Sequence, residues 1–261
     1  MYAVAAVKSI DHRNNRPKEQ LDRLLKSPES SACEGRVELR ENTTLDPLYV
    51  TILWEVFGHD DPEDDPRTRS ILGAVVLATN PLSPPMIAAL FGLNTKDILL
   101  QLSSVHSLLI LQEDVNNPIQ PFHKSFPDFI IDPTWCSNQR FHTPPPNHHS
   151  ELLIGCLKLM NQGLGKNMCQ LPDGVKNNEV DDLWERVDHY IDHSLQYACK
   201  SWHKHLVDLC MVPSHTLEIT STLNQFLEEK FIFWLEVLSV LGAARDAVDA
   251  LDMAAKCLKV C

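Results

Sequence analysis

The sequence predicts a mainly α-helical protein that carries one small two-stranded β-wing. Apolar residues recur every three or four positions along most of its 261 residues, which is the spacing of one face of an α-helix. Hydrophobic residues make up 44% of the chain and only 9 residues are glycine, as expected for a helical protein with a substantial core. Two short strand-like runs near the middle interrupt this pattern. The predicted order is a truncated helical subdomain, a winged helix, and then a helical bundle or irregular helical array.

Residues 1–58 are expected to be the remainder of a small helical subdomain. The first of its three predicted helices ends near Asp11, and the second begins at Pro17, because proline suits a first helical position. Asp46 is expected to cap the third helix, with Pro47 in its first turn. Four residues of that helix are predicted to face inward: Leu48, Ile52, Leu53 and Val56. The apolar start of the chain resembles a helix cut through its middle, so we expect a fragment of a longer protein.

Residues 59–66 are strongly acidic and are expected to form a solvated linker. The whole chain carries a formal net charge of -12, and such a surface repels phosphodiester backbones, so generic nucleic-acid binding is not favoured. The eight cysteines contain no C-x-x-C pair and suit reduced, buried thiols, which predicts a cytoplasmic protein. The apolar N-terminal stretch is far too short for a membrane span, and no membrane partner is predicted.

Residues 67–135 are predicted to form a winged helix, because three helices followed by a two-stranded wing is the arrangement of that helix-turn-helix variant. Ser83 is expected to cap the second helix, Gly92 to end it, and Asn94 to cap the third. The predicted helices are Thr68–Ala78, Met86–Phe91 and Thr95–Ser107, the strands are Leu108–Gln112 and Ile119–Phe122, and one more helical stretch covers Lys124–Ile131.

Residues 150–261 are predicted to be a helical domain that follows a stiff proline-rich break at 143–147. Apolar residues at helical spacing indicate five helices, which begin near Ser150, Val180, Leu195, Leu217 and Ala243. Their lengths and spacings vary, so no repeat of fixed period is predicted.

Several candidate sites in the sequence lack the pattern that their chemistry needs. The run from Gly163 to Asn167 resembles a phosphate-binding loop, but it lacks the upstream glycine and the Ser or Thr that would hold Mg²⁺, so a loop between helices is expected. Ser125 lies two residues after His123 without a G-x-S-x-G elbow around it, and its hydroxyl is expected to cap the following helix. No catalytic residue is predicted.

Metal sites are not predicted either. Cys199, His203, His205 and Cys210 are close in sequence, but the two histidines are expected on different helix faces, whereas a structural zinc site draws paired ligands from two elements. The adjacent pair His148 and His149 is expected to lie in a solvated region at a helix start.

A family resemblance is carried by the segment Phe122–Phe129, which reads Phe-His-Lys-Ser-Phe-Pro-Asp-Phe. This segment resembles the one that ends the winged helix in NACHT-type (STAND) signalling NTPases, which include animal NOD-like receptors. Residues 77–83, 107–114 and 195–203 are similar to the fungal branch of that family. Those are the NACHT proteins of mushroom-forming fungi, often joined to WD repeats and likened to heterokaryon-incompatibility proteins. The resemblance covers nearly the whole chain.

The resemblance implies a role for His123. Family members hold ADP between a P-loop core and the winged helix, and the histidine of this segment touches the terminal phosphate and helps keep the resting state closed. Carried over by motif position, that role falls on His123, whose imidazole N–H can donate to a phosphate oxygen. ADP or ATP is thereby implied for the full-length family. No cofactor is predicted for this chain, because it lacks the Walker A loop and the parallel sheet of the core.

We therefore predict a non-catalytic regulatory fragment in which the winged helix gates a nucleotide-binding core that the chain does not contain. Its partners would be that core or other protein domains. Two alternatives remain. One is a winged-helix adaptor that binds nucleic acid, although the third helix offers only Lys96 and Gln101 for contacts to DNA. The other is a plain helical protein-interaction scaffold.

Overall fold

The computed structural model describes residues 45–57, 64–136, 138, 140–210 and 217–260. The first two predicted helices and residues 58–63 lie outside this part of the chain. The α-helices are α3 (Asp46–Phe57), α4 (Asp64–Leu77), α5 (Pro84–Phe91), α6 (Thr95–Ser104), α7 (Ser125–Ile131), α8 (Pro145–Gly163), α9 (Leu183–Tyr190), α10 (His193–Cys210), α11 (Leu217–Gln225), α12 (Phe231–Val240) and α13 (Asp246–Val260). The prediction of a mainly α protein is confirmed.

Several helix starts differ from those predicted. Helix α8 begins at Pro145, so Ser150 lies inside this helix and not at its start. Asp46 is the first residue of α3 and not its cap, and its buried Oδ1 atom has no hydrogen-bond partner among the described residues. Helix α4 begins at Asp64, so the last three residues of the expected acidic linker, 64–66, are helical. At the start of α3 and of α4 a proline follows within two residues, and proline is tolerated in the first turn, where its missing N–H has no intrahelical partner.

The order of α4, α5, α6 and the two strands is the order predicted for residues 67–135. Asn94 caps α6, since its side chain accepts a hydrogen bond from the N–H of Lys96. Gly92 ends α5 with a left-handed φ of 64°, a conformation that favours glycine. Ser83 precedes α5 but makes no side-chain cap. The assignment of this segment as a winged-helix domain stays a prediction.

The wing consists of β1 (Leu109–Ile110) and β2 (Gln120–Pro121), which pair in antiparallel register with Leu109 opposite Pro121. The pair is shorter than the two predicted strands. Two further backbone hydrogen bonds stabilise the wing. The N–H of Phe122 donates to the Leu108 carbonyl at 2.8 Å, and the N–H of Ile119 donates to the Leu82 carbonyl at 2.8 Å. The second bond ties the wing to the segment before α5.

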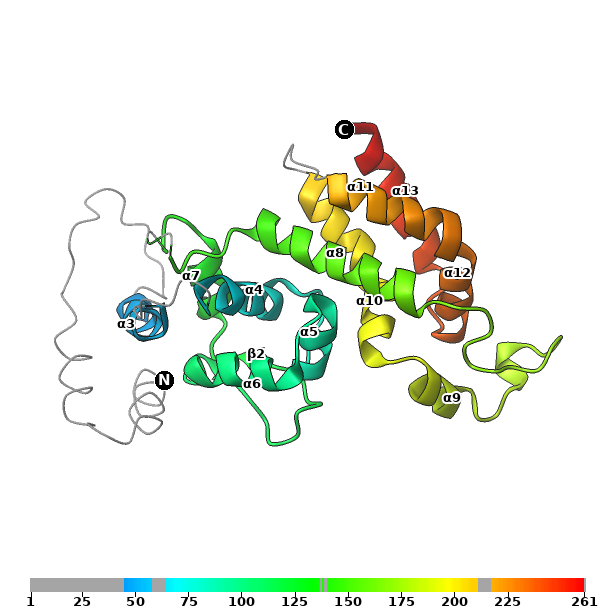
Figure 1. Cartoon of the computed structure of the whole chain (residues 1–261), viewed down its shortest axis with the longest axis horizontal. Coiled ribbons are helices and arrows are strands. Elements are labelled where there is room, and N and C mark those ends of the chain that lie inside the picture. Colours follow the sequence, from blue (N-terminus) through cyan, green and yellow to red (C-terminus); the bar gives the residue numbers. More distant parts are fainter. Residues whose placement is uncertain (1–44, 58–63, 137, 139, 211–216, 261) are drawn as a thin grey trace.

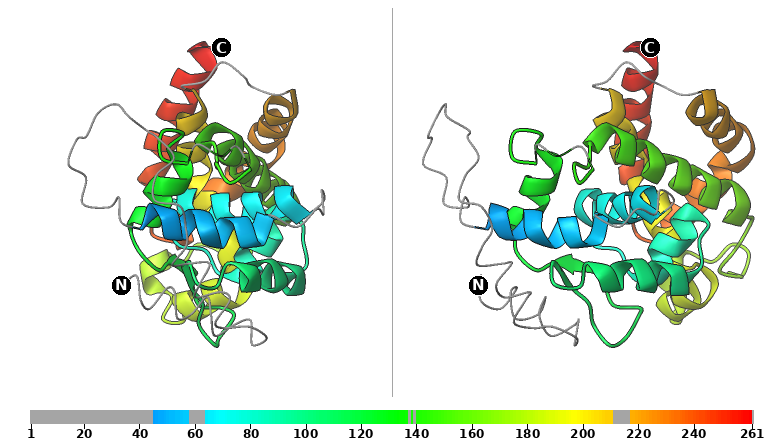
Figure 2. Two further views of the ribbon diagram at one scale, coloured as in Figure 1. Left: turned by 90° about the vertical axis from the view of Figure 1, so that its left-hand side faces the viewer. Right: turned by 60° about the vertical axis from the view of Figure 1, so that its left-hand side comes forward.

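Helix α8 crosses the middle of the molecule and packs on α4 and α5 as well as on α10 and α11 (Figure 1). Helix α3 lies against α7 at one end, while α9 lies toward the other (Figures 1 and 2). Close packing across α8 depends on two glycines. A Cβ at Gly73 of α4 would lie 2.4 Å from Cγ of His148, and a Cβ at Gly155 of α8 would lie 2.5 Å from the Leu90 carbonyl oxygen.

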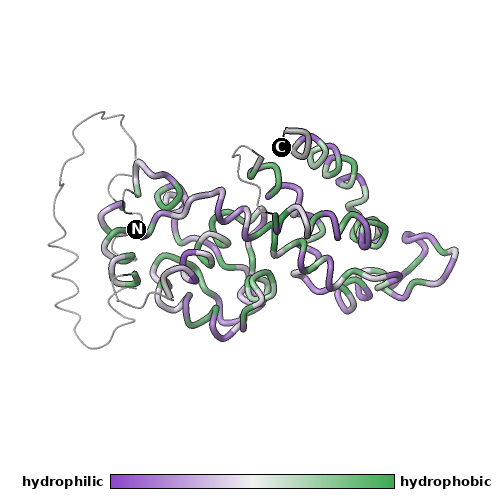
Figure 3. The backbone as a smooth tube through the Cα atoms, turned by 45° about the horizontal axis from the view of Figure 1, so that its top comes forward, coloured by the Kyte–Doolittle hydropathy of each residue, from purple (hydrophilic) through white to green (hydrophobic). Residues whose placement is uncertain are grey.

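Buried apolar residues form one cluster that runs from α3 to α13. Along the helices, hydrophobic positions alternate with hydrophilic ones, as helical periodicity requires (Figure 3). In the C-terminal part three large rings, those of Trp202, Phe226 and Trp234, meet edge to face with centroids 5.3–5.9 Å apart. The indole N–H of Trp234 donates to the Cys199 carbonyl at 2.9 Å, so this aromatic group fixes α12 on α10. None of the helices in the described ranges is both long and apolar enough to cross a bilayer.

Candidate functional site

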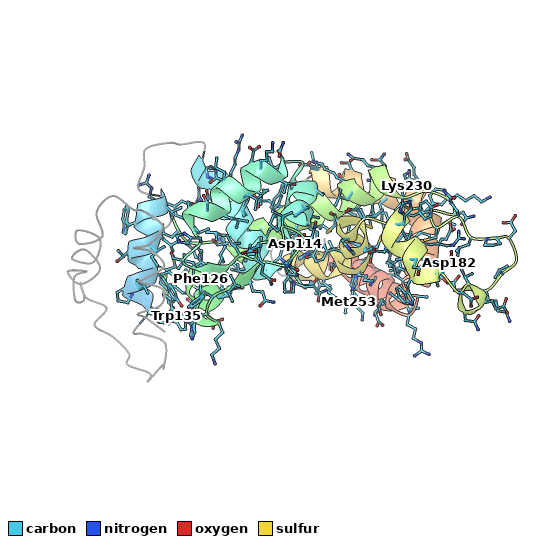
Figure 4. The ribbon with its side chains drawn as sticks, turned by 90° about the horizontal axis from the view of Figure 1, so that it is seen from below. Asp114, Phe126, Trp135, Asp182, Lys230 and Met253 are labelled. Atoms are coloured by element: carbon cyan, nitrogen blue, oxygen red, sulfur yellow. The ribbon has the colours of Figure 1, made fainter. Side chains whose placement is uncertain are left out.

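The predicted phosphate-contact residue, His123, lies at the corner where β2 runs into α7. Its carbonyl accepts a hydrogen bond from the N–H of Phe126 at 3.1 Å, which starts the turn into the helix. Phe126 and Phe129 are fully buried and lie against the ring of Tyr49 on α3, with centroid distances of 5.5 and 5.3 Å. Figure 4 shows Phe126 beside α3, at the end of the molecule opposite Asp182. The aromatic pair therefore anchors the corner, and the His123 side chain is left half-buried.

A short hydrogen-bond chain holds the imidazole of His123. The Oγ of Ser125 lies 2.7 Å from Nδ1 of His123 and 2.9 Å from the hydroxyl of Tyr49. The backbone N–H of Ser125 also donates to Nδ1, at 3.2 Å. Since Nδ1 accepts that bond, the proton of the neutral ring is placed on Nε2. Within the described residues Nε2 has no hydrogen-bond partner, so it is the donor that a ligand would meet.

Ser125 has a different role from the predicted one. It is the first residue of α7, with Lys124 at the N-cap, and its fully buried hydroxyl bonds Tyr49 and His123. The expectation that this hydroxyl caps the helix is wrong, because the neighbouring rings compete for it. Burial, and to a smaller extent the charge of Asp46, raises the pKa of Tyr49, so the phenol stays protonated. With no exposed oxygen, Ser125 is not placed to attack a substrate.

The space beside His123 is too small for a nucleotide. The cavity that Tyr49, Leu108, Phe122 and His123 share has a volume of about 10 Å³, which is room for about one water molecule. A phosphate could approach only from the outer side of the ring, held by groups other than those that line this cavity.

A larger cavity, of about 460 Å³, lies between α4 and α8. Its polar groups bond one another: Glu151 accepts from Ser70 at 3.1 Å and lies 2.9 Å from Nδ1 of His148. The other histidine in its wall, His142, has Nε2 3.1 Å from the Ile131 carbonyl. The carboxylate and both histidines of this cavity are therefore engaged within the protein, and Arg69 and Asn147 also line it.

The glycine-rich run from Gly163 to Asn167, which lacks the pattern of a phosphate-binding loop, connects two helices and contacts α12. Gly163 is the last residue of α8, and Asn167 adopts a left-handed φ of 49° in the turn that follows. The N–H of Asn167 donates to the carboxylate of Glu236 on α12 at 2.9 Å. A carboxylate therefore occupies the position at which a phosphate would be needed, and the expected loop between helices is confirmed.

One histidine prediction is wrong, because His148 and His149 are buried on α8 and do not lie in a solvated region. His203 and His205 are also buried on α10, and their neighbours agree with the predicted different faces: His205 contacts His149 of α8, whereas His203 is influenced by Asp246 and Asp249 of α13. The helical spacing could have indicated that these histidines are buried. His149 precedes Leu152 and Leu153 by three and four positions, and His205 follows Trp202 by three, so each lies on the same helix face as large apolar residues. Sequence alone does not show that His149 and His205, 56 positions apart, meet with their Nδ1 atoms at 3.0 Å.

Comparison with known proteins finds a distant fungal relative. The chain is 25% identical, over 233 residues, to the vegetative incompatibility protein HET-E-1 of Podospora anserina. The match covers 79% of this chain and 16% of the relative. No family model matches the chain, and no solved structure matches it. The likeness agrees with the resemblance to fungal proteins likened to heterokaryon-incompatibility proteins, and it supports a NACHT-related signalling protein.

Proposed function

We propose that this chain is a regulatory part of a NACHT-type signalling NTPase. In the proposal, residues 67–135 form a winged helix that gates a nucleotide-binding core supplied from outside the chain. The distant likeness to a fungal incompatibility protein supports the family. The absence of a G-x-x-x-x-G-K-[ST] loop from the sequence supports a role without catalysis. The chain would act in the cytoplasm through contacts with protein domains.

The orientation of His123 is the observation that carries the proposal. Its Nδ1 is engaged by Ser125, and its Nε2 has no hydrogen-bond partner among the described residues, so Nε2–H would be available as a donor to a ligand. A phosphate oxygen of ADP is an acceptor that fits this donor, and a charged acceptor strengthens the bond. Loss of one such contact would shift a two-state equilibrium by about 1–3 kcal/mol. His123 would then favour the resting, ADP-bound state.

The nucleic-acid alternative gains no support from α6. The side chain of Gln101 accepts a hydrogen bond from Thr68 of α4 at 2.6 Å, so it is engaged within the protein. The exposed side of α6 carries Lys96, Asp97 and Leu100, and the Leu100 side chain is 69% exposed. A surface that is partly apolar and carries no net charge is better suited to packing against another protein than to binding a phosphodiester backbone.

A chimaera tests the proposal. The chain would replace the corresponding region of a NACHT protein that keeps its own P-loop core, and release of a fluorescent ADP would be timed. We expect His123→Ala to speed release by about 5–150-fold, the range that a coupling of 1–3 kcal/mol gives. Lys124→Ala, at the exposed neighbour, is the matched control and should leave the rate unchanged.

The alternatives predict other results. A plain scaffold predicts that His123→Ala lowers folding stability and leaves ADP release as it was. A nucleic-acid adaptor predicts salt-sensitive DNA binding by the purified chain near neutral pH. Robust ATP hydrolysis by the isolated chain, lost in His123→Ala, would overturn the proposal of a non-catalytic role.

A further inference from the structure

A second cluster of functional groups lies where α8 packs on α10. It consists of His149 on α8 with His205 and Asp208 on α10, the last two three positions apart on one helix face. One ring nitrogen from each histidine and one carboxylate oxygen lie within 4.8 Å of one another. Nδ1 of His149 is 3.0 Å from Nδ1 of His205, and Nε2 of His149 is 3.6 Å from Oδ2 of Asp208.

Two imidazole nitrogens that face each other at this distance must share either a proton or a cation. Zinc binds imidazole nitrogen at about 2.0–2.1 Å, so two nitrogens on one tetrahedral zinc lie about 3.3 Å apart. The observed 3.0 Å is close to that separation. A carboxylate is the usual third donor in such sets, and the Asp208 side chain is 51% exposed. Its carboxylate lies nearest Nε2 of His149, on the other side of the ring from Nδ1, so it must turn to reach an ion held between the two Nδ1 atoms, and its exposure leaves it room to do so.

The surroundings hold the two rings as metal ligands are usually held. Nε2 of His205 lies 2.9 Å from the hydroxyl of Tyr197, and metal-binding histidines are commonly oriented by such a bond from the second ring nitrogen. Tyr197 in turn accepts from the N–H of Thr79 at 3.4 Å.

We propose that His149, His205 and Asp208 form a binding site for a divalent transition-metal ion of the zinc class, with water completing the coordination. The bound ion would cross-link α8 to α10. Because Tyr197 connects the site to Thr79, just after α4, the ion would also stiffen the contact between the winged-helix segment and the helical region. The site is independent of His123 and of the proposed nucleotide core.

Zinc titration of the full 261-residue chain, stripped with EDTA and followed by calorimetry, tests the site. We expect one Zn²⁺ per chain, and affinity lowered at least tenfold in Asp208→Asn. This variant changes a half-exposed side chain and is expected to fold. His149→Gln and His205→Gln should weaken binding further, with folding checked by circular dichroism. The matched control is His193→Gln, because His193 lies 3.4 Å from Asp188 in an exposed histidine–aspartate pair. The zinc affinity of this variant should equal that of the wild type.

Two further readouts separate this site from other ligands. Co²⁺ in place of zinc should give the visible bands of nitrogen and oxygen ligands; a strong thiolate charge-transfer band would assign the ion to cysteines and overturn the proposal. Zinc should raise the melting temperature of the wild type by several degrees and leave Asp208→Asn nearly unchanged. Equal zinc affinity in the wild type and Asp208→Asn, or no binding at all, would show that the two rings share only a proton.

Discussion

The hydroxyl oxygen of Ser125 lies 2.7 Å from Nδ1 of His123, so Nδ1 is engaged within the protein, while Nε2 has no hydrogen-bond partner among the described residues. The same hydroxyl reaches Tyr49 on α3. The segment that resembles the NACHT motif is therefore joined to the helix that precedes it by 76 positions. The orientation of the proposed phosphate contact depends on tertiary packing as well as on the motif.

Removal of this hydroxyl is expected to destabilise the protein. Ser125→Ala leaves the buried hydroxyl of Tyr49 without its partner, at a cost of about 1–3 kcal/mol. Urea unfolding measures the loss. Ser103→Ala serves as the control, because that hydroxyl bonds only the Leu100 carbonyl of its own helix at the surface. A double-mutant cycle with Tyr49→Phe should give a coupling of about 0.5–3 kcal/mol; additive effects would show that the bond contributes nothing.

A methyl group at Gly73 should disrupt the seam between α4 and α8. The added Cβ would lie 2.4 Å from Cγ of His148, so the imidazole or a helix must move, at a cost of about 1–3 kcal/mol. Gly165→Ala is the matched control, since a Cβ there meets nothing within 4 Å. Thermal unfolding of the two variants should differ by several degrees. Equal melting temperatures would contradict the packing described at this seam.

The stability of the chain should fall as the pH drops below about 6.5, measured with EDTA present. Burial lowers the pKa of His149 and that of His205, the latter to about 3. Below the unfolded value of about 6.5, the unfolded chain takes up protons that the folded chain does not, so the free energy of unfolding decreases. Each such group contributes a slope of about 1.4 kcal/mol per pH unit until its folded pKa is reached.

Urea unfolding at pH 7 and pH 5 tests this dependence. His205→Gln should reduce the dependence of the unfolding free energy on pH, whatever its effect on stability at neutral pH. An unchanged slope in the variant would mean that other groups cause the acid sensitivity. The exposed His193 provides the comparison, because its replacement by glutamine should leave the slope as it is.

Replacement of Asp46 by asparagine should stabilise the protein at neutral pH. One carboxylate oxygen of Asp46 is buried and has no partner in the part of the chain that the structure describes, and burial raises the pKa of the carboxyl group above its ordinary value of 3.8. A raised carboxyl pKa means that ionisation costs folding free energy as the pH rises through that value. Asp46→Asn removes the cost, so its melting temperature should exceed that of the wild type at pH 7. The gain should vanish near pH 3, where both side chains are neutral.

Helix positions and inward-facing residues could be predicted from local chemistry. The apolar spacing in α3 predicted that Leu48, Ile52, Leu53 and Val56 face the core; the first three are buried and Val56 is partly buried against it. Gly92 and Asn94 mark the boundary between α5 and α6 because their backbone and side-chain preferences act over a few residues. The wing was also predicted, although it is shorter than the apolar runs that suggested it.

The errors arose where partners distant in sequence decide a side chain's role. Ser125 has the residue type and position of a helix cap, yet Tyr49 and His123 take its hydroxyl. His149 was expected in solvent because two adjacent histidines at a helix start read as polar surface. The approach of α10 buries it against His205.

The sequence by itself determined the helical class, the order of the elements and the motif that places His123 at a β-to-α corner. It could do so because periodicity, capping and turn chemistry act within about one or two helical turns. Only the tertiary structure decided that Ser125 bonds Tyr49 and that His149, His205 and Asp208 lie close together. Those arrangements depend on how α3 meets α7 and how α8 meets α10, and contacts between segments 56 and 76 positions apart leave no local pattern in the chain.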